Sequence, residues 1–481
     1  MLTGVNLLLR LVSTSFQVYI SGRIGAAGVG LLQLVLSVGM LAMTAGMAGV
    51  RTATMYLTAE ELGRKQAQNV SWVLSGCFLY SILCSGIISL GLFISAPFLA
   101  THWIGDVGTI GAIRLFASFL PITCLCGCMT GYFTAANRIG TLAAVEVAEQ
   151  LLSMTATMIA LNFWAGTDSA KACQAVVFGS GLGACLTLLC LVVLRIRERA
   201  IAGARIPVAR RLLEAAVPLA LADDLKAGIS STENLMVPKR LALYPGTENP
   251  LAAFGTVCGM VFPVMMFPAA ILFGLSELLI PELARCNAAG SRQRISYLVR
   301  RSLRVAMLYG FLCAGILFLN AQALCTALYG SEDAGAYLRL YALLVPMLYC
   351  DCITDAMTKG LGQQKICVRY NILTSFMDVV FLFILLPKYG MIGYFFSFLV
   401  THLLNFILSI RQLFKISGTK ISPHLPLLTA IAAAIGVWAS SLLAQPLGKS
   451  VAFVLLFSSL LVLLKVLHKE DLHWVKGLVR M

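Results

Sequence analysis

Long apolar runs alternate with short polar gaps along almost the whole chain. Each run holds about the 20 residues that an α-helix needs to cross the roughly 30 Å hydrocarbon core of a bilayer. Because spanning helices satisfy their own backbone hydrogen bonds, the pattern predicts an all-α polytopic membrane protein. We read fourteen transmembrane helices, at 2–20, 28–50, 70–94, 110–135, 141–164, 172–194, 212–234, 252–280, 303–320, 336–358, 370–386, 390–410, 425–443 and 450–467.

The composition agrees with this interpretation and excludes other classes. Of the 481 residues, 59% are hydrophobic and only 12% are charged, against about 45–50% and about 25% in soluble domains. A soluble enzyme, a disordered protein and a nucleic-acid binder are therefore excluded, although the net charge is +15. The 15 cysteines lie mostly inside the apolar runs, where cysteine serves as a small hydrophobic side chain.

The basic residues are unevenly divided between the two sets of alternate gaps. The set that includes 51–69, 195–211, 281–304 and the C-terminal segment holds 26 lysines and arginines, and the other set holds 6. Basic residues concentrate in cytoplasmic gaps. We therefore expect an even number of spans and both termini in the cytoplasm.

The fourth and tenth runs share a proline, Pro121 and Pro346, ahead of a short polar turn. Six helices separate the two runs, so the two halves of the chain would share one orientation, as in a parallel repeat about an axis along the membrane normal. The basic gap 195–211 separates these halves. We predict a six-helix lobe at 1–200, a second six-helix lobe at 201–415, and two additional helices with a cytoplasmic tail at 416–481.

The first run carries a polar stripe on one helical face. Asn6, Arg10, Thr14 and Gln17 follow the spacing of an α-helix, while leucines and valines cover the other faces. A charge at the centre of a bilayer costs about 2.5–3.5 kcal/mol, so Arg10 needs water or a partner. Either the stripe lines a cavity in which Arg10 contacts a phosphate, or Arg10 pairs with a carboxylate such as Glu149 and holds helices together.

The seventh run contains Asp223, Asp224 and Lys226 in mid-span. Asp223 and Lys226 are three residues apart and can pair, whereas two adjacent buried carboxylates are costly, so at least one should face water. Pro218 and Gly228 predict a broken or bent helix, a feature that marks substrate sites in transporters.

Other charged residues in or beside the runs are candidates for ion coupling or for the mouth of a cavity. Arg51 begins the first cytoplasmic gap, where it either guards the inner mouth or sets the topology. Glu149, Asp351, Asp355 and Asp378 each serve either as a proton or sodium coupling group or as a structural hydrogen-bond acceptor. Asp355 and Lys359 are four residues apart and can satisfy one another.

Several sequence signals of catalysis or ATP use are absent. The chain has no Walker A loop and no H-E-x-x-H motif, and its five histidines do not cluster along the chain. ATP-driven transport by this chain alone is therefore excluded. We expect no enzymatic activity, no metal site and no cofactor beyond Na⁺ or H⁺ coupling.

Six short stretches, taken together, resemble one family of membrane proteins. They are Ser21–Gly30, Glu233–Leu241, Gly259–Pro268, Leu278–Glu282, Leu344–Tyr349 and Lys359–Lys365. Over about residues 5–415 the chain is similar to the stage V sporulation protein B family. That family is a branch of the multidrug/oligosaccharidyl-lipid/polysaccharide (MOP) exporter superfamily, which also includes the lipid II flippases of the MurJ type.

The resemblance implies two six-helix lobes around a central cavity and two C-terminal helices that border a groove for a lipid tail. It implies a flippase in a bacterial plasma membrane that moves an undecaprenyl-diphosphate-linked sugar, such as lipid II, for peptidoglycan, spore cortex or polysaccharide synthesis. Arg10 matches a family arginine that faces the diphosphate, while Gln17 stands where the family usually has a second cation.

The alternative function is a cation-coupled multidrug exporter of the same fold, and a membrane-embedded sugar transferase ranks below it. The expected partners are the lipid-linked substrate and membrane lipid. We expect a monomer that binds no nucleic acid.

Overall fold

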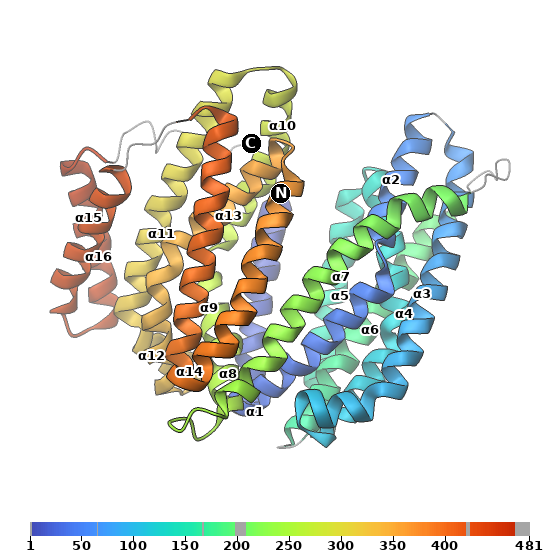
Figure 1. The fold of residues 1–481 in the computed structure, drawn as a ribbon, viewed down its shortest axis with the longest axis horizontal. Coiled ribbons are helices and arrows are strands. Elements are labelled where there is room, and N and C mark those ends of the chain that lie inside the picture. The colour runs from blue at the N-terminus through green and yellow to red at the C-terminus, as the bar shows by residue number, and fades with distance from the viewer. Residues whose placement is uncertain (1, 65, 166–167, 198–207, 420–423, 467–481) are drawn as a thin grey trace. The chain divides into compact units, whose positions relative to one another are not determined.

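The computed structural model describes residues 2–466 apart from 65, 166–167, 198–207 and 420–423. For a few further residues, 2–10 among them, it describes the backbone only. The described residues form helices joined by short turns and contain no strand (Figure 1). The all-α prediction is therefore confirmed.

Two compact units account for the fold. Unit 1 comprises residues 1–2 and 23–255, and unit 2 comprises 3–22 and 256–481. The helices that fall in unit 1 after α1 are α2 (Val50–Gly63), α3 (Val70–Phe98), α4 (Ile110–Ala135), α5 (Ile139–Ala160), α6 (Ser169–Arg197), α7 (Val208–Leu241) and α8 (Pro250–Gly255).

Unit 2 holds the remaining helices and the π-helical segment η5 (Thr256–Val261). These helices are α9 (Phe262–Met266), α10 (Ala270–Ala288), α11 (Arg292–Tyr329), α12 (Glu332–Tyr341), α13 (Val345–Gly360), α14 (Gln364–Ser417), α15 (His424–Ser441) and α16 (Pro446–Leu463). Helix α1 (Leu2–Met47) contributes its first part to unit 2 and its second part to unit 1.

Ten described helices are long and apolar enough to cross a membrane, or eleven if the bent pair Pro250–Met266 and Ala270–Ala288 forms one span. Two of them, Leu11–Gly63 and Gln364–Ser417, exceed 50 residues, more than twice the length that one span requires. Each is interrupted by a glycine with non-helical angles, Gly25 (φ 68°, ψ 177°) and Gly390 (φ 57°, ψ −140°). With the bent pair counted as one span, dividing each of these two helices in two and adding the charged α7 gives fourteen, the predicted number of spans. The chain is a multi-pass membrane protein.

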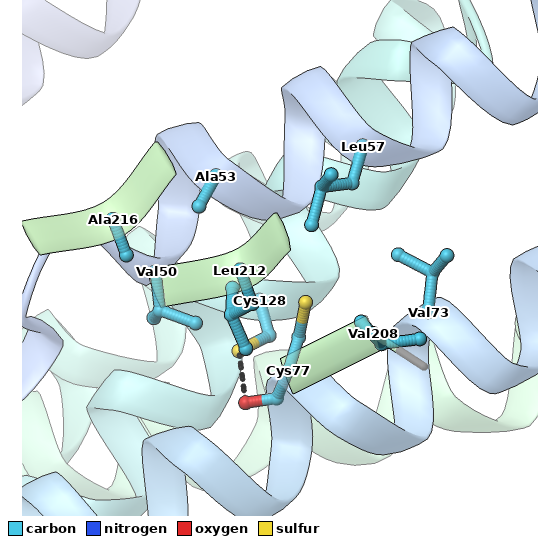
Figure 2. Close-up of a cluster of buried hydrophobic side chains, with 9 residues drawn as sticks. All are labelled: Val50, Ala53, Leu57, Val73, Cys77, Cys128, Val208, Leu212 and Ala216. Atoms are coloured by element: carbon cyan, nitrogen blue, oxygen red, sulfur yellow. Dashed lines mark hydrogen bonds between the residues drawn. The ribbon is translucent and has the colours of Figure 1, made fainter. Parts of the chain in front are cut away.

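Helix α7 packs into the core of unit 1. Val208, Leu212 and Ala216 of α7 join Val50, Ala53 and Leu57 of α2, Val73 and Cys77 of α3, and Cys128 of α4 in one buried cluster (Figure 2). In the same cluster the Cys128 thiol lies 3.7 Å from the Cys77 carbonyl oxygen. This packing explains why the structural division follows Gly255, whereas the predicted first lobe ends at residue 200.

Of the two predicted alternatives for α7, a break or a bend, the break is wrong and the bend stays a prediction. The helix continues from Val208 to Leu241 through Pro218 and Gly228. Proline removes one backbone hydrogen bond from a helix, but contacts on both sides of Pro218 hold α7 to unit 1. The buried cluster lies before it, and Ser231 and Asn234 form hydrogen bonds after it.

Helices α15 and α16 pack on α11 and on one another (Figure 1). The rings of Phe453 and Phe457 on α16 stack at 5.5 Å and are buried against this surface. A Cβ on Gly315 of α11 would overlap the Phe453 ring. The glycine therefore permits the close packing of α16 on α11 within unit 2.

Candidate functional site

A polar pocket lies within unit 1, between the second part of α1, the start of α2 and the middle of α7. Its volume is about 580 Å³, in the range of small-molecule sites. We call it the α1–α7 pocket. Arg51, Asp223 and Lys226 line it together with Gln33, Ser37, Thr44, Thr52, Ser230, Ser231, Asn234 and three methionines.

Hydrogen bonds fix α7 to α1 along one wall of the pocket. The Ser231 hydroxyl donates to the Ser37 carbonyl at 2.9 Å, and the Asn234 amide donates to the Ser37 hydroxyl at 3.0 Å. The Ser37 hydroxyl in turn donates to the Gln33 carbonyl at 2.8 Å. These bonds hold the polar faces of the two helices toward one another.

Gly49 sets the distance between α7 and the turn that joins α1 to α2. Its φ of 71° lies in the left-handed region, which glycine adopts without steric cost. A Cβ at this position would lie 2.5 Å from the Ala216 carbonyl oxygen of α7. The glycine thus places Arg51, two residues further on, in the same pocket as the charges of α7.

The charges of the pocket are available to a ligand. Arg51, Asp223 and Lys226 form no ion pair among the described residues, so the predicted pairing of Asp223 with Lys226 is not found. The pocket contains two cations against one carboxylate. Arginine and lysine bind phosphate strongly, and the hydroxyl and amide groups can hydrogen-bond a sugar.

The other predicted site residues lie elsewhere. The Asp224 carboxylate is half-buried, its Oδ1 has no hydrogen-bond partner among the described residues, and it does not line the pocket. The Gln17 amide, in unit 2, donates to the Gly259 carbonyl of η5 at 3.0 Å. Asn6 and Arg10 fall on a helical backbone, but their side chains lie outside the described residues.

Each of the four candidate coupling carboxylates has a polar partner. The Glu149 carboxylate accepts from the Thr187 hydroxyl at 2.6 Å, between α5 and α6. Asp355 pairs with Lys359 at 2.6 Å. The contacts of Glu149 and Asp355 are typical of structural residues. That either carboxylate couples transport to an ion stays a prediction.

Asp378 is the most deeply buried of the four carboxylates, and Asp351 is half-buried. Asp378 is 5% exposed and accepts from the Ser397 hydroxyl at 2.5 Å and from the Thr401 hydroxyl at 3.2 Å. These bonds join the two parts of α14 on either side of Gly390. Asp351 Oδ2 accepts from the Asn405 amide at 3.1 Å, whereas Asp351 Oδ1 and Asn405 Oδ1 are buried with no partner among the described residues.

Sequence reasoning missed the uncharged lining of the pocket. Gln33, Ser37, Met40, Thr44 and Met47 recur at helical spacing on α1 and all line it. That periodicity in the second apolar run was the available signal. No group of three or more histidine, cysteine, aspartate or glutamate side chains suited to a metal ion occurs among the described residues.

Comparison with known proteins gives the same fold. The MatE family model matches residues 242–384. The stage V sporulation protein B of Bacillus subtilis (strain 168) is 22% identical over 408 residues, which cover 82% of this chain and 78% of that protein.

Two solved structures of transporters are similar over most of the chain. The lipid II flippase MurJ in an inward closed conformation has a TM-score of 0.65 at 12% identity, over 95% of this chain and 97% of MurJ. A multidrug resistance MATE family transporter of the MOP superfamily, in an inward-facing conformation, has a TM-score of 0.67 at 15% identity, over 86% of this chain and 100% of the transporter. The chain is a homologue of stage V sporulation protein B that contains a MatE region and has the fold of MOP superfamily transporters.

Proposed function

We propose that the chain is a flippase for an undecaprenyl-diphosphate-linked sugar, either lipid II or a related oligosaccharide. It moves the sugar head across a bacterial plasma membrane by alternating access, for peptidoglycan, spore cortex or polysaccharide synthesis. The observation that carries this proposal is the α1–α7 pocket, in which Arg51 and Lys226 form no ion pair and share the lining with hydroxyl and amide groups. The homology to stage V sporulation protein B and the fold shared with MurJ support it.

The pocket suits the charged end of such a lipid. Arg51 offers two parallel N–H donors to a phosphate, and Lys226 adds a second charge from the opposite helix. Ser230 and Thr52 also line the pocket, and their hydroxyl groups can hydrogen-bond a sugar. The substrate would be bound and released without chemical change, so the activity requires no catalytic group.

The direction of movement follows from charge. The inside-negative potential of a bacterial cell favours outward movement of an anion, by about 2.3 kcal/mol per charge per 100 mV. A diphosphate could therefore move with the potential as its only energy source.

Asp378 and Asp351 are the candidates for coupling to Na⁺ or H⁺. Asp378 is a buried carboxylate that accepts from two hydroxyl groups, and Asp351 is a half-buried carboxylate that accepts from an amide group. Asp378→Asn removes the charge and keeps the shape. If Asp378 couples transport to an ion, this variant loses the dependence of flipping on the Na⁺ or proton gradient while it retains folding. An unchanged gradient dependence assigns Asp378 a structural role only.

Genetic complementation tests the proposal in cells. The chain is expressed in a bacterium depleted of its essential lipid II flippase, and growth and lipid II on the outer leaflet are measured. We expect the wild type to restore both, and Lys226→Gln to lose at least tenfold of the surface lipid II, because a charge-assisted hydrogen bond contributes about 1.5–3 kcal/mol. Arg114→Gln is the matched control, since Arg114 is exposed and lies over the Phe93 ring, away from the pocket.

A cation-coupled multidrug exporter is the second candidate. Asp223 in the pocket could hold a cationic drug, and Met40, Met43 and Met47 provide an adaptable apolar wall. The exporter hypothesis predicts that proteoliposomes containing the chain take up a cationic dye when an ion gradient is imposed. The Asp223→Asn substitution should abolish this uptake. Dye transport without lipid II transport would favour the exporter over the flippase.

A further inference from the structure

Asp351 and Asn405 form a polar pair inside unit 2. The Asn405 amide, on the second part of α14, donates to Oδ2 of Asp351 on α13 at 3.1 Å. The other oxygens of the pair, Asp351 Oδ1 and Asn405 Oδ1, are both buried, and neither has a hydrogen-bond partner among the described residues. The pair therefore has two unbonded acceptors and lacks a donor for them.

The position of the pair makes the missing donor costly. Asn405 is 9% exposed, and Asp351 lies about 14 Å along the helix axis from Gly360, where α13 ends. The helical segments that contain the two residues are long and apolar enough to cross a membrane. A buried acceptor without a donor loses the hydrogen bonds that water would give it. A group that supplies a donor here would therefore stabilise the contact between α13 and α14.

Among the described residues no cation is bonded to Asp351. Lys359 pairs with Asp355 at 2.6 Å, one helical turn from Asp351, and Asp351 itself forms no ion pair. Asp355 and Lys359 are the charged residues that act on Asp351. An ionised Asp351 would stand beside a carboxylate that already holds the nearby cation, and a like charge disfavours ionisation.

Ionisable groups on the helices packed against α13 do not bond to the pair. Helix α14 carries His402, whose Nδ1 lies 3.0 Å from a carbonyl oxygen of the same helix. Helix α11 carries Arg304, which donates to a backbone carbonyl, and α10 carries Glu277. Among the described residues, none of these three groups forms a bond to Asp351 or Asn405. The two cysteines that flank Asp351 along α13 are neutral as thiols.

A proton satisfies the pair better than a metal ion. Hard metal cations gather six or more oxygen ligands, whereas the pair offers two unbonded oxygens. A protonated Asp351 becomes a donor at one oxygen and stays an acceptor at the other. Because the terminal torsion of aspartate is broad, the Asp351 hydroxyl can turn to Asn405 Oδ1 while the Asn405 amide still donates to Oδ2. The two side chains then form the reciprocal hydrogen bonds that a carboxylic acid forms with a primary amide.

We propose that Asp351 and Asn405 form a proton-binding site, in which Asp351 is protonated at neutral pH and donates to the Asn405 oxygen. One proton satisfies both unbonded oxygens and strengthens the contact between α13 and α14. When the proton leaves, the carboxylate and the amide oxygen repel one another and the contact weakens. The role of this proton in transport rests on the proposed function: its binding and release couple flipping to a proton gradient, and the ion used at Asp351 is H⁺ instead of Na⁺.

Infrared difference spectroscopy of the full-length chain in lipid vesicles detects the proton directly. A protonated carboxyl group has a C=O stretching band distinct from the bands of a carboxylate, and subtraction of the Asp351→Asn spectrum isolates the contribution of Asp351. We expect a protonated band at neutral pH that disappears as the pH is raised. Asp351→Asn should fold, because its amide can donate to Asn405 Oδ1 as the protonated acid does. Asn405→Leu should keep the band and move it to higher frequency, because the Asp351 C=O loses its donor.

Asp333→Asn is the matched control, since Asp333 is an exposed carboxylate in the first turn of α12. Subtraction of its spectrum should show a carboxylate band and no protonated band at neutral pH. Thermal unfolding gives a second readout. A proton held more tightly by the folded chain stabilises it at low pH, and this contribution is lost as the pH rises. Wild type and Asp333→Asn should share this loss of stability, and Asp351→Asn should show less of it.

Three results would overturn the proposal. The first is a carboxylate band of Asp351 at neutral pH that persists down to about pH 5, above the usual titration range of aspartate. The second is a carboxylate band that shifts when Na⁺ replaces choline in the buffer, which would assign a metal cation to the site. The third is a protonated band that Asn405→Leu leaves at the wild-type frequency, which would show that the two side chains do not share the proton.

The measurement separates this proposal from the proposed function, because it requires no transport. A protonated Asp351 in a chain that does not flip lipid II would contradict the flippase function and leave the proton site standing. Flipping by a chain in which Asp351 is ionised at neutral pH would contradict the proton site and leave the flippase function standing.

Discussion

Gly49→Ala tests whether the close contact between α7 and the α1–α2 turn builds the α1–α7 pocket. The added Cβ would lie 2.5 Å from the Ala216 carbonyl oxygen and 3.1 Å from the Ala220 nitrogen, and both are backbone atoms of a long helix that cannot rotate away. The variant must therefore strain the turn or push α7 outward, which moves Asp223 and Lys226 away from Arg51.

Two separate costs contribute to the effect. Holding alanine at a φ of 71° costs about 1–2 kcal/mol relative to glycine, and overpacking a tight contact costs typically 1–3 kcal/mol. Gly105→Ala isolates the first cost, because Gly105 also has a positive φ, 87°, but a Cβ added there would meet only open space. We expect Gly49→Ala to destabilise the protein by about 1–3 kcal/mol more than Gly105→Ala.

The assay is reversible unfolding of the purified protein in mixed micelles, together with binding of undecaprenyl diphosphate. Gly49→Ala should lower both stability and ligand affinity, while Gly105→Ala should lower stability alone. If the two variants are equally stable and bind equally well, the contact with α7 does not build the pocket and the reasoning is refuted.

The remaining predictions concern an ion pair and a helix contact. Arg211→Gln should destabilise unit 1 by about 1–3 kcal/mol, because Arg211 bonds two glutamates of α2 at 2.7 and 2.9 Å and the glutamate that is 1% exposed loses its charged partner. Arg210→Gln, whose ion pair is exposed, should cost less than about 1 kcal/mol in the same unfolding assay. Gly315→Val should displace the Phe453 ring and lower the free energy of unfolding. Gly91→Val, with open space around it, should not lower it. Equal destabilisation by the two substitutions would contradict the packing of α16 on α11.

The sequence predicted the helices well because each span must bury about 20 apolar residues, and that requirement is local. It predicted α7 as a span despite its charges. It also placed the two breaks, since Gly25 lies in the gap between the predicted spans 2–20 and 28–50 and Gly390 lies where the predicted spans 370–386 and 390–410 meet, but it did not identify the glycines that take the non-helical conformation. Pro218 was a stronger local signal for a break, but tertiary contacts keep α7 continuous.

The candidate site was predicted in part. Asp223 and Lys226 stood out because a charge in an apolar run is costly, and Arg51 because it begins the first cytoplasmic gap. The structure brings the three residues into one pocket. Ser37 and Asn234 did not stand out, because uncharged polar residues are tolerated in any span and their hydrogen bonds depend on which helices are neighbours. The roles of Arg10 and of the coupling carboxylates remain predictions.

Direct observation of flipping tests the central claim. The purified chain is reconstituted into proteoliposomes with fluorescent lipid II, an inside-negative or inside-positive potential is imposed, and the fraction accessible to an external quencher is followed. The proposal predicts movement that depends on the protein, follows the sign of the potential and is lost in the Arg51→Gln, Lys226→Gln double variant. No movement by correctly inserted wild-type protein, under either potential and with or without a Na⁺ or proton gradient, would contradict it.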